Sequence, residues 1–299
     1  MTNWEVIMIK LLLDTDIGSD IDDVFALAYL LRQPECELLG ITTVTGEAVD
    51  RAKMASAMCK AVGKDHIPVY AGASMPLIGE QKQLYAIQAE AVENWPHQKD
   101  FPVGGAVEFM RQTIRRHPGE VTLLAIGPMT NVAMLFAVDP EIPALLKELV
   151  LMCGIFDYKT PAYTCLSEWN SRCDPYASAI MYNAPDKNIK SIGLDVTVQV
   201  TMEVADIKPK LTGELGRLML DFINKRQSDK FITFHDPLAA AVIFKSDICG
   251  FMRGNVEVEL DSARLRGLTY WEADLNGKNE AAFTVDSDGF FKHYFEILG

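Results

Sequence analysis

The sequence contains no apolar run long enough to cross a membrane. No stretch of the 299-residue chain reaches the roughly 18 consecutive apolar residues that a membrane helix requires. The segment Met1 to Lys10 also lacks the basic start, long apolar stretch and small-residue cleavage site of a secretory signal. These absences predict a cytoplasmic protein.

Cysteine pairs with the spacing of a redox or zinc motif are also missing. The six cysteines are scattered without a CxxC pattern, and a chain of this length does not need disulfides to form a core. We therefore expect reduced and mostly buried thiols. The cysteines are Cys36, Cys59, Cys153, Cys165, Cys173 and Cys249.

Basic residues are too few for a general nucleic-acid or anionic-membrane binder. The chain has 28 Lys and Arg against 41 Asp and Glu, and its net charge is −13. A hydrophobic content of 49% is enough for a large core, and no proline- or glycine-rich linker divides the sequence. The sequence predicts one domain that spans residues 1–299.

Aspartate, by contrast, is concentrated near the amino terminus. Five aspartates fall within ten residues, between an apolar run and a helix-like run: Asp14, Asp16, Asp20, Asp22 and Asp23. Carboxylates this close repel one another and raise one another's pKa. An acidic loop that caps a helix N-terminus would need only one or two of them. The cluster therefore predicts a bound cation.

The residue types in the cluster indicate which cation it binds. The cluster contains no Cys or His, so its donors are carboxylate oxygens, which suit Ca²⁺ or Mg²⁺ better than Zn²⁺ or copper. Calcium takes roughly 6 to 8 oxygen ligands in irregular geometry, whereas magnesium requires an octahedron and keeps several waters. The number of acidic residues favours Ca²⁺.

Short apolar runs alternate with helical patterns along most of the chain. Continuous apolar strands of this kind are typical of a mostly parallel, doubly wound α/β sheet with helices on both faces. The predicted pairs are Ile7–Leu13 with Asp22–Arg32, Glu37–Thr43 with Val49–Val62, Val121–Ala125 with Asn131–Ala137, and Glu148–Met152 with Pro175–Asn183. From Asn255 onwards the alternation of apolar and polar residues predicts antiparallel strands, and His235–Pro237 is expected to open a helix over Leu238–Phe244.

Polar segments fall where these strands end. Ligands of doubly wound sheets bind outside the carboxyl ends of the strands, and the aspartate cluster follows the first strand. Further polar residues occupy Thr42–Glu47, Ile126–Asn131, Ser167–Asn170 and His235–Pro237. Each segment alone is compatible with ordinary turn and cap chemistry. Their common position at strand ends predicts one composite site.

Taken together, these segments resemble the inosine-uridine-preferring nucleoside hydrolase family. The match extends over almost the whole chain, and the order and spacing of the motifs are specific although each motif is short. The matching motifs include Asp14–Asp23, Thr42–Glu47, Tyr70–Ala73, Ile126–Asn131, Leu151–Gly154, Glu168–Pro175, Gly193–Asp195, His235–Pro237 and Asp286–Asp288.

The resemblance implies a calcium-dependent hydrolase that cleaves the N-glycosidic bond of a nucleoside to ribose and free base. By motif matching, the implied metal ligands are Asp16, Asp23, Asp236 and the backbone carbonyl of Ile126. Asp16 is also the implied general base, and His235 matches the position proposed to protonate the departing base. A histidine at the start of a helix could instead orient Asp236. The implied ribose contacts are Asp22, Glu168 and Asn170. The resemblance also suggests a homodimer or homotetramer.

Four departures from the family pattern concern the substrate more than the metal. Ser19, Asp20 and Ile21 lengthen the acidic loop, so Asp20 could take over a task assigned here to Asp22 or Asp23. Glu47 stands where many members have Asn, which adds a negative charge among the substrate contacts. The segment 81–99 lacks the family's His-Gly motif, and Ala162 replaces a ribose-contacting Asn. The sequence does not decide which base is preferred. We expect the base contacts to come from Leu77–Trp95 and Phe222–Phe234.

Two other functions are compatible with parts of the sequence. Asp14 and Asp16 after an apolar strand also look like the nucleophile and acid of a haloacid-dehalogenase-type phosphatase with Mg²⁺. That alternative leaves His235 and Glu168 without a role. The second alternative is a non-catalytic, calcium-dependent protein that binds ribose or nucleosides.

Overall fold

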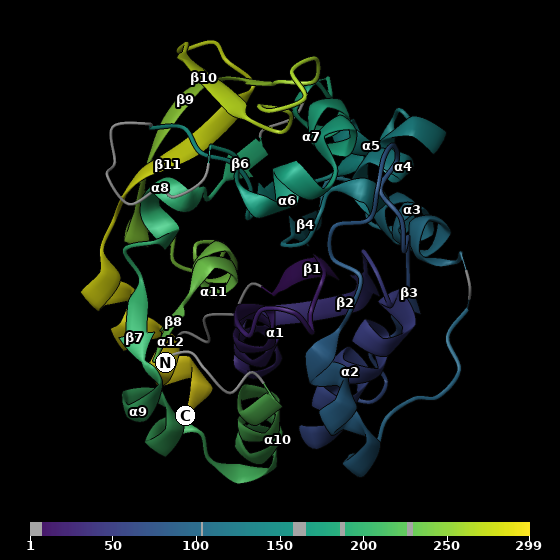
Figure 1. Ribbon diagram of the computed structural model, residues 1–299, viewed down its shortest axis with the longest axis vertical. Helices are drawn as coiled ribbons and strands as arrows, with labels where there is room; N and C mark the ends of the chain where they lie inside the picture. The colour runs from purple at the N-terminus through teal and green to yellow at the C-terminus, as the bar shows by residue number, and fades with distance from the viewer. Residues whose placement is uncertain (1–7, 103, 158–165, 186–188, 226–229) are drawn as a thin grey trace, which may run out of the picture.

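The structure is a computed structural model that describes residues 8–102, 104–157, 166–185, 189–225 and 230–299. Its strands form a nine-stranded sheet and a separate two-stranded sheet (Figure 1). The strands are β1 (Ile9–Thr15), β2 (Cys36–Thr43), β3 (Val69–Ala71), β4 (Val121–Ala125), β5 (Glu148–Leu151), β6 (Ile189–Ser191), β7 (Thr201–Glu203), β8 (Phe231–Thr233), β9 (Cys249–Val258), β10 (Thr269–Ala273) and β11 (Asn279–Val285).

Helices provide most of the connections between these strands. The α-helices are α1 (Asp22–Arg32), α2 (Ala48–Ala61), α3 (Ala106–Arg116), α4 (Thr130–Val138), α5 (Ile142–Leu145), α6 (Trp169–Cys173), α7 (Pro175–Tyr182), α8 (Leu194–Thr197), α9 (Val204–Ile207), α10 (Gly213–Lys225), α11 (His235–Ala241) and α12 (Ser287–Leu298). The 3₁₀ helices are η1 (Ile87–Asn94), η2 (Lys208–Lys210) and η3 (Ser246–Ile248).

The large sheet has the order β10-β9-β11-β6-β5-β4-β1-β2-β3. Neighbours from β3 to β11 along this order run parallel, whereas β9 runs antiparallel to both β11 and β10. The predicted mostly parallel sheet with antiparallel carboxyl-terminal strands is therefore confirmed. The antiparallel part begins at Cys249, before the expected Asn255, because the first residues of β9 pair with the end of β11.

Both faces of the sheet are covered by helices, as the continuous apolar strands predict. Successive side chains of a strand point to opposite faces. Accordingly, Leu11 and Leu13 of β1 join a core cluster with α1, α2, α10, α11 and α12, whereas Leu12 joins a cluster with α3, α4 and α7. Figure 1 shows α1 and α2 on one side of β1 and β2, and α3 and α4 on the other.

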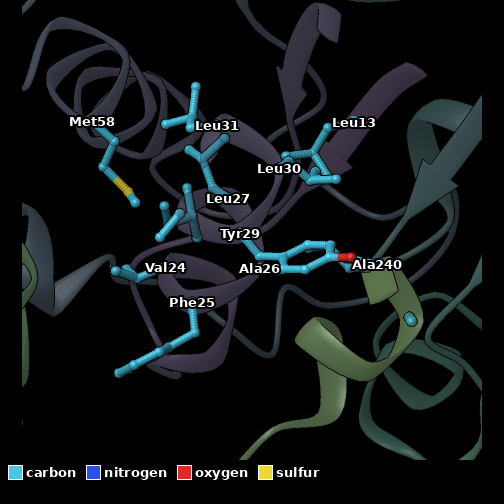
Figure 2. Packing of buried hydrophobic residues seen from close by; sticks show 14 of the residues in the cluster. Leu13, Val24, Phe25, Ala26, Leu27, Tyr29, Leu30, Leu31, Met58 and Ala240 are labelled. Atoms are coloured by element: carbon cyan, nitrogen blue, oxygen red, sulfur yellow. The ribbon is translucent and has the colours of Figure 1, made fainter. Parts of the chain in front are cut away.

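Helix α1 is buried on nearly all sides. Residues 22–31 are all buried, and the helix begins and ends at the predicted residues. Figure 2 shows its side chains among Leu13 of β1, Met58 of α2 and Ala240 of α11. Each fully buried Leu or Phe contributes about 1.5 to 3 kcal/mol to stability. This packing fixes the first turn of α1, which carries Asp22 and Asp23.

The order of the strands switches sides at β1, which lies third from the β3 edge of the sheet. From β1 the chain continues to β2 and β3 on one side, and β4, β5 and β6 follow on the other side. In the ladder Asp14 lies between Thr42 of β2 and Ala125 of β4, and the amide of Ile126 donates to the Asp14 carbonyl over 2.9 Å. Such a switch point leaves a crevice at the carboxyl ends of the strands.

A few predicted boundaries differ from the structure. The first strand continues to Thr15, past the predicted end at Leu13, because Asp14 and Thr15 stay in register with β2; Ile7 lies outside the described residues. The helix expected to reach Phe244 ends at Ala241. The small β7–β8 sheet was not predicted. The single-domain organisation over residues 1–299 stays a prediction.

The cysteines that the structure describes are buried and free of disulfides, as expected: Cys36, Cys59, Cys153, Cys173 and Cys249. Cys165 and Ala162 lie outside the described residues. Within the described ranges no helix has both the length and the apolar character of a membrane span.

Candidate active site

A cavity of about 490 Å³ opens at the switch point of the sheet, a size typical of small-molecule sites. Its wall combines residues from the loop after β1, the ends of β4 and β5, and the starts of α1, α6 and α11. Most of the predicted site residues line it: Asp16, Asp20, Asp22, Asp23, Ile126, Glu168, Asn170, His235 and Asp236. Segments far apart in the sequence therefore meet in one pocket.

Three carboxylates form the densest charge in this pocket. Oxygen atoms of Asp22, Asp23 and Asp236 all lie within 4.8 Å of one another, and the three residues are buried. The backbone amide of Asp236 donates to Oδ2 of Asp22 over 3.4 Å, and the hydroxyl of Thr15 donates to Oδ1 of Asp23. The packing of α1 against α11 holds the three side chains together. The predicted ribose contact Asp22 thus sits among the predicted metal ligands.

The carboxylates are held in an unfavourable state when no cation is bound. Burial raises the pKa of Asp22 to about 6. Burial also raises the pKa values of Asp23 and Asp236 far above their usual range, and the charges of Asp16 and the neighbouring carboxylates add to the effect. Buried charges of one sign need a counter-charge or a proton. The trio has the chemistry of a hard-cation site.

Asp16 follows directly on β1, at the edge of the same pocket. Its Oδ2 accepts a hydrogen bond of 2.7 Å from Nε2 of Gln83. A Cβ atom at Gly127 would lie only 2.9 Å from both the amide nitrogen and Oδ1 of Asp16, so the loop after β4 can approach Asp16 this closely only with glycine there. Burial raises the pKa of Asp16, and the charge of Arg51 opposes that rise.

Arg51 is a fully buried cation that sequence reasoning missed. Its guanidinium donates to the carbonyls of Gly46 over 2.7 Å, Ile17 over 3.2 Å and Tyr85 over 3.3 Å, and also to the carbonyl of Asp16. One side chain therefore joins three loops around the pocket. An arginine near the start of the α2 pattern is usually a surface residue, and no sequence signal indicated that Arg51 would be buried and bind these loops.

Gln83 links Asp16 to the opposite wall. Its Nε2 donates to Asp16 and, over 2.7 Å, to the Ser19 hydroxyl, while its Oε1 accepts from Nε1 of Trp169 over 2.6 Å. The expectation that Leu77–Trp95 contributes to the substrate pocket is consistent with this arrangement, because Gln83, Ile87 and Gln88 all line the wall. The segment has no strong periodicity, so the sequence did not single out these residues.

Glu168 and Asn170 begin helix α6 and are held by internal hydrogen bonds. The Glu168 carboxylate accepts from the amides of Asn170 (2.6 Å), Ser171 (3.0 Å) and Gly154 (3.2 Å). Nδ2 of Asn170 donates to the carbonyls of Ile126 and Met152, each over 2.9 Å. Burial raises the pKa of Glu168 to about 7, against these amide donors. Asn170 therefore contacts the same Ile126 carbonyl that is implied as a metal ligand.

His235 precedes Asp236 in the first turn of α11. Its Nδ1 lies 2.7 Å from the Thr197 hydroxyl, which leaves Nε2 for another partner. Burial lowers the pKa of His235 to about 4, so the imidazole is neutral at pH 7. A neutral ring donates from one of its two nitrogens, and Nδ1 either donates to the Thr197 hydroxyl or accepts from it.

Asp20 and Glu47 lie differently from the other predicted residues. Asp20 is exposed at the pocket rim and is not part of the carboxylate trio. Glu47 does not line the pocket. It is exposed beside a neighbouring hollow, where its Oε2 accepts from the amide of Ala86 over 2.7 Å. The turn after β2 thus directs Glu47 away from the carboxylates.

The phosphatase alternative is inconsistent with the position of Asp14. Asp14 is fully buried and does not line the pocket, and its Oδ1 accepts from Nδ2 of Asn131 over 2.8 Å and from the Thr42 hydroxyl. Burial raises its pKa to about 7. A nucleophile must reach its substrate as an ionised group. Asp14 instead joins β1 to β2 and α4.

The raised carboxyl pKa values predict how stability depends on pH without a cation. The folded-state pKa of Asp22, about 6, exceeds its ordinary value of 3.8. The folded protein therefore binds this proton more tightly than the unfolded chain, so the contribution to stability is present below pH 4 and is lost as pH rises through about 6. A shift of two units is worth about 3 kcal/mol.

We expect a higher Tm at pH 5 than at pH 7.5 in the presence of a chelator. Asp22→Asn should reduce this dependence without abolishing it, because the asparagine does not titrate but the other buried carboxyls with raised pKa values remain. If the chelated wild-type protein has the same or a higher Tm at pH 7.5 than at pH 5, the raised carboxyl pKa values would be contradicted.

Several nucleoside hydrolases of known structure share this fold. A plant nucleoside hydrolase gives a TM-score of 0.83 at 24% identity over 97% of this chain and 98% of that chain. The purine-preferring ribonucleoside hydrolase from Gardnerella vaginalis gives a TM-score of 0.81 at 24% identity, with coverage of 97% and 98%. These likenesses establish the fold. The model of the inosine-uridine preferring nucleoside hydrolase family matches residues 11–292, and the chain belongs to that family.

Sequence relatives agree with this membership. An inosine-uridine preferring nucleoside hydrolase from Leishmania major is 30% identical over 306 residues, which cover 94% of this chain and 95% of that protein. Uridine nucleosidase 1 from Arabidopsis thaliana is 27% identical over 318 residues, which cover 95% and 91%. The chain is therefore a hydrolase that acts on the N-glycosyl bonds of ribonucleosides, in a metal-dependent family.

Proposed function

We propose that this protein is a calcium-dependent nucleoside N-ribohydrolase that cleaves purine or pyrimidine ribonucleosides, or both, to ribose and free base. The observation that carries the proposal is the carboxylate trio of Asp22, Asp23 and Asp236, which lies within 4.8 Å at the switch point of the fold. Family membership supplies the reaction class. The proposal adds the identity of the cation and the range of nucleosides that are cleaved.

The residues present fit a hard divalent cation. Asp16, Asp23, Asp236 and the Ile126 carbonyl would hold it, with Asp22 beside them. All are oxygen donors, and no thiol or imidazole belongs to the trio. Three acidic side chains in an irregular arrangement favour Ca²⁺ over Mg²⁺. A bound cation would supply positive charge that lowers the pKa of a nearby water molecule.

Asp16 is the proposed general base. It lies in the pocket wall as a carboxylate that the Gln83 amide orients, and it can take a proton from the attacking water as the glycosidic bond breaks. Departure of the base leaves positive charge on the ribose ring, and carboxylates near the sugar stabilise that charge. Asp22, Glu168 and Asn170 are the proposed contacts of the ribose hydroxyls.

His235 is proposed to face the departing base. The neutral imidazole, with Nδ1 held by Thr197, can donate a hydrogen bond to a base nitrogen from Nε2 when the Thr197 hydroxyl is the donor to Nδ1. We leave Glu47 out of the substrate contacts because it caps Ala86 outside this pocket. Asp20, at the rim, is retained only as a residue near the substrate entrance. From the resemblance we also propose a homodimer or homotetramer with a role in nucleoside salvage.

The test is release of free base from a mixture of nucleosides. The calcium-loaded protein is incubated with inosine, guanosine, adenosine, uridine and cytidine, and the bases are separated by chromatography. We expect free base from at least one nucleoside and none after chelation. Ribose binding in a calorimeter with no base released from any nucleoside would identify a non-catalytic binding protein and would overturn the proposal.

A further inference from the structure

Gln88 is a fully buried glutamine in η1 that lines the active-site pocket and has no hydrogen-bond partner on either polar atom of its side chain. Within the described part of the chain, the other buried side-chain atoms without a partner belong to Asp14, Thr122, Ser171, Trp271 and Asn279. None of those residues lines the pocket. Gln88 is thus the one described pocket residue with an unused buried amide.

Gln83, five residues earlier in the same wall, has a structural role and can be compared with Gln88. Gln83 uses both atoms of its amide, with hydrogen bonds of 2.6 to 2.7 Å to Asp16, Ser19 and Trp169. Gln88 shares the segment and the pocket but makes none of these contacts. The difference indicates that the Gln88 amide is not needed to hold the protein together.

The backbone around Gln88 is nevertheless fixed. The backbone N–H of Gln88 donates to the Gly18 carbonyl over 3.1 Å, and a Cβ atom at Gly18 would lie 3.0 Å from Cβ of Ala86. Helix η1 also packs against α2 and α10. The backbone at Gln88 is therefore held beside the acidic loop. A buried amide without a partner is destabilising, and a ligand that pairs with it offsets that cost.

The polar groups of the pocket suit different parts of a nucleoside. The hydroxyls of ribose are best met by the carboxylates, which only accept hydrogen bonds when ionised. A neutral amide offers a donor and an acceptor side by side, which match the adjacent carbonyl and N–H of uracil or hypoxanthine. Ile87 and Leu194 line the same cavity and provide apolar contact for a planar ring.

We propose that Gln88 determines specificity by pairing its amide with the donor and acceptor edge of the nucleobase. This inference rests on the proposed nucleoside hydrolysis and adds the part of the substrate that the protein recognises, which is the nucleobase. It predicts that bases with an unmodified lactam edge are preferred over bases whose ring N–H carries a methyl group.

The test compares uridine with 3-methyluridine and inosine with 1-methylinosine. The methyl group removes the ring N–H at a position distant from the glycosidic bond. We expect the wild-type protein to favour each unmodified nucleoside by about 10- to 100-fold in kcat/KM, the size of one to two hydrogen bonds left unmade. Gln88→Met, which keeps the length of the side chain, should lower kcat/KM for uridine and inosine by the same factor. The kcat/KM values of this variant for each unmodified nucleoside and its methylated form should then differ by less than about threefold.

Two controls distinguish base recognition from a general effect. Gln112→Met, on the exposed face of α3, should leave both ratios unchanged. Calorimetry with calcium and ribose, which has no base, should give the same affinity for the wild type and Gln88→Met. An unchanged ratio in Gln88→Met, or an equal loss of ribose affinity, would overturn the inference.

Failure of the proposed function gives a different pattern. If the wild type releases no base from any nucleoside, the hydrolase proposal fails, and Gln88 is then judged by calorimetric binding of inosine and 1-methylinosine. Equal affinity of the wild type for these two ligands would overturn the inference about Gln88 independently of turnover.

Discussion

Asp16→Asn is expected to lower kcat by about 10³-fold at saturating calcium, because the proton acceptor for the attacking water is lost. The substitution is nearly isosteric, so the loop that Arg51 holds through the Asp16 carbonyl should stay in place. The measurement is the steady-state rate with the best nucleoside found. KM should change far less than kcat, since the ribose contacts remain.

The matched control for this variant is Asp65→Asn, which removes a carboxylate from the exposed surface. It should retain wild-type rates. Calcium affinity has to be measured for Asp16→Asn in parallel, because Asp16 is also a proposed metal ligand. A variant that binds calcium and nucleoside and still turns over at the wild-type rate would exclude Asp16 as the base.

Removal of the cation is expected to abolish turnover and to lower the melting temperature by roughly 5 to 10 °C. A ligand present at 100 times its dissociation constant stabilises the folded state by about 2.7 kcal/mol, and each kcal/mol shifts Tm by about 2 to 4 °C in a protein near this size. The carboxylate trio adds to this effect, since without a cation the three groups repel one another or take up protons.

The measurement is thermal unfolding and turnover with chelator, calcium or magnesium at matched ionic strength. Asp236→Asn should lose most of the calcium-dependent rise in Tm, because it removes the ligand that α11 contributes. We expect calcium to restore activity and Tm at a much lower concentration than magnesium does. A chelated protein with full activity would exclude a metal-dependent reaction.

The framework of the fold could be predicted because its signals are local and repeated. Helix α1 begins and ends at the predicted residues, and β4 matches as well. Apolar strands of four to eight residues, separated by helical patterns, admit few arrangements other than a parallel sheet covered on both faces. The acidic loop was recognisable for a different reason: so many like charges are not tolerated at a strand end without a counter-ion.

The contacts between side chains of distant loops could not be predicted. Arg51 and Gln83 belong to an ordinary helix and an irregular segment, and their hydrogen bonds to Asp16 form only when these segments meet. Glu47 shows the opposite case. Its place in a motif suggested a substrate contact, but the turn after β2 points it at the amide of Ala86. Position in a motif predicts proximity, whereas the direction of a side chain depends on the local backbone.

The separation of the trio along the chain has a consequence for synthesis. Asp22 and Asp236 are 214 residues apart, so a nascent polypeptide carries its acidic loop through most of translation before the α11 carboxylate is available. The proposed cation can bind tightly only after that late segment has docked on α1. Two separately expressed pieces, divided ahead of α11, would therefore associate more tightly when calcium is supplied, which makes fragment complementation a direct readout of site assembly.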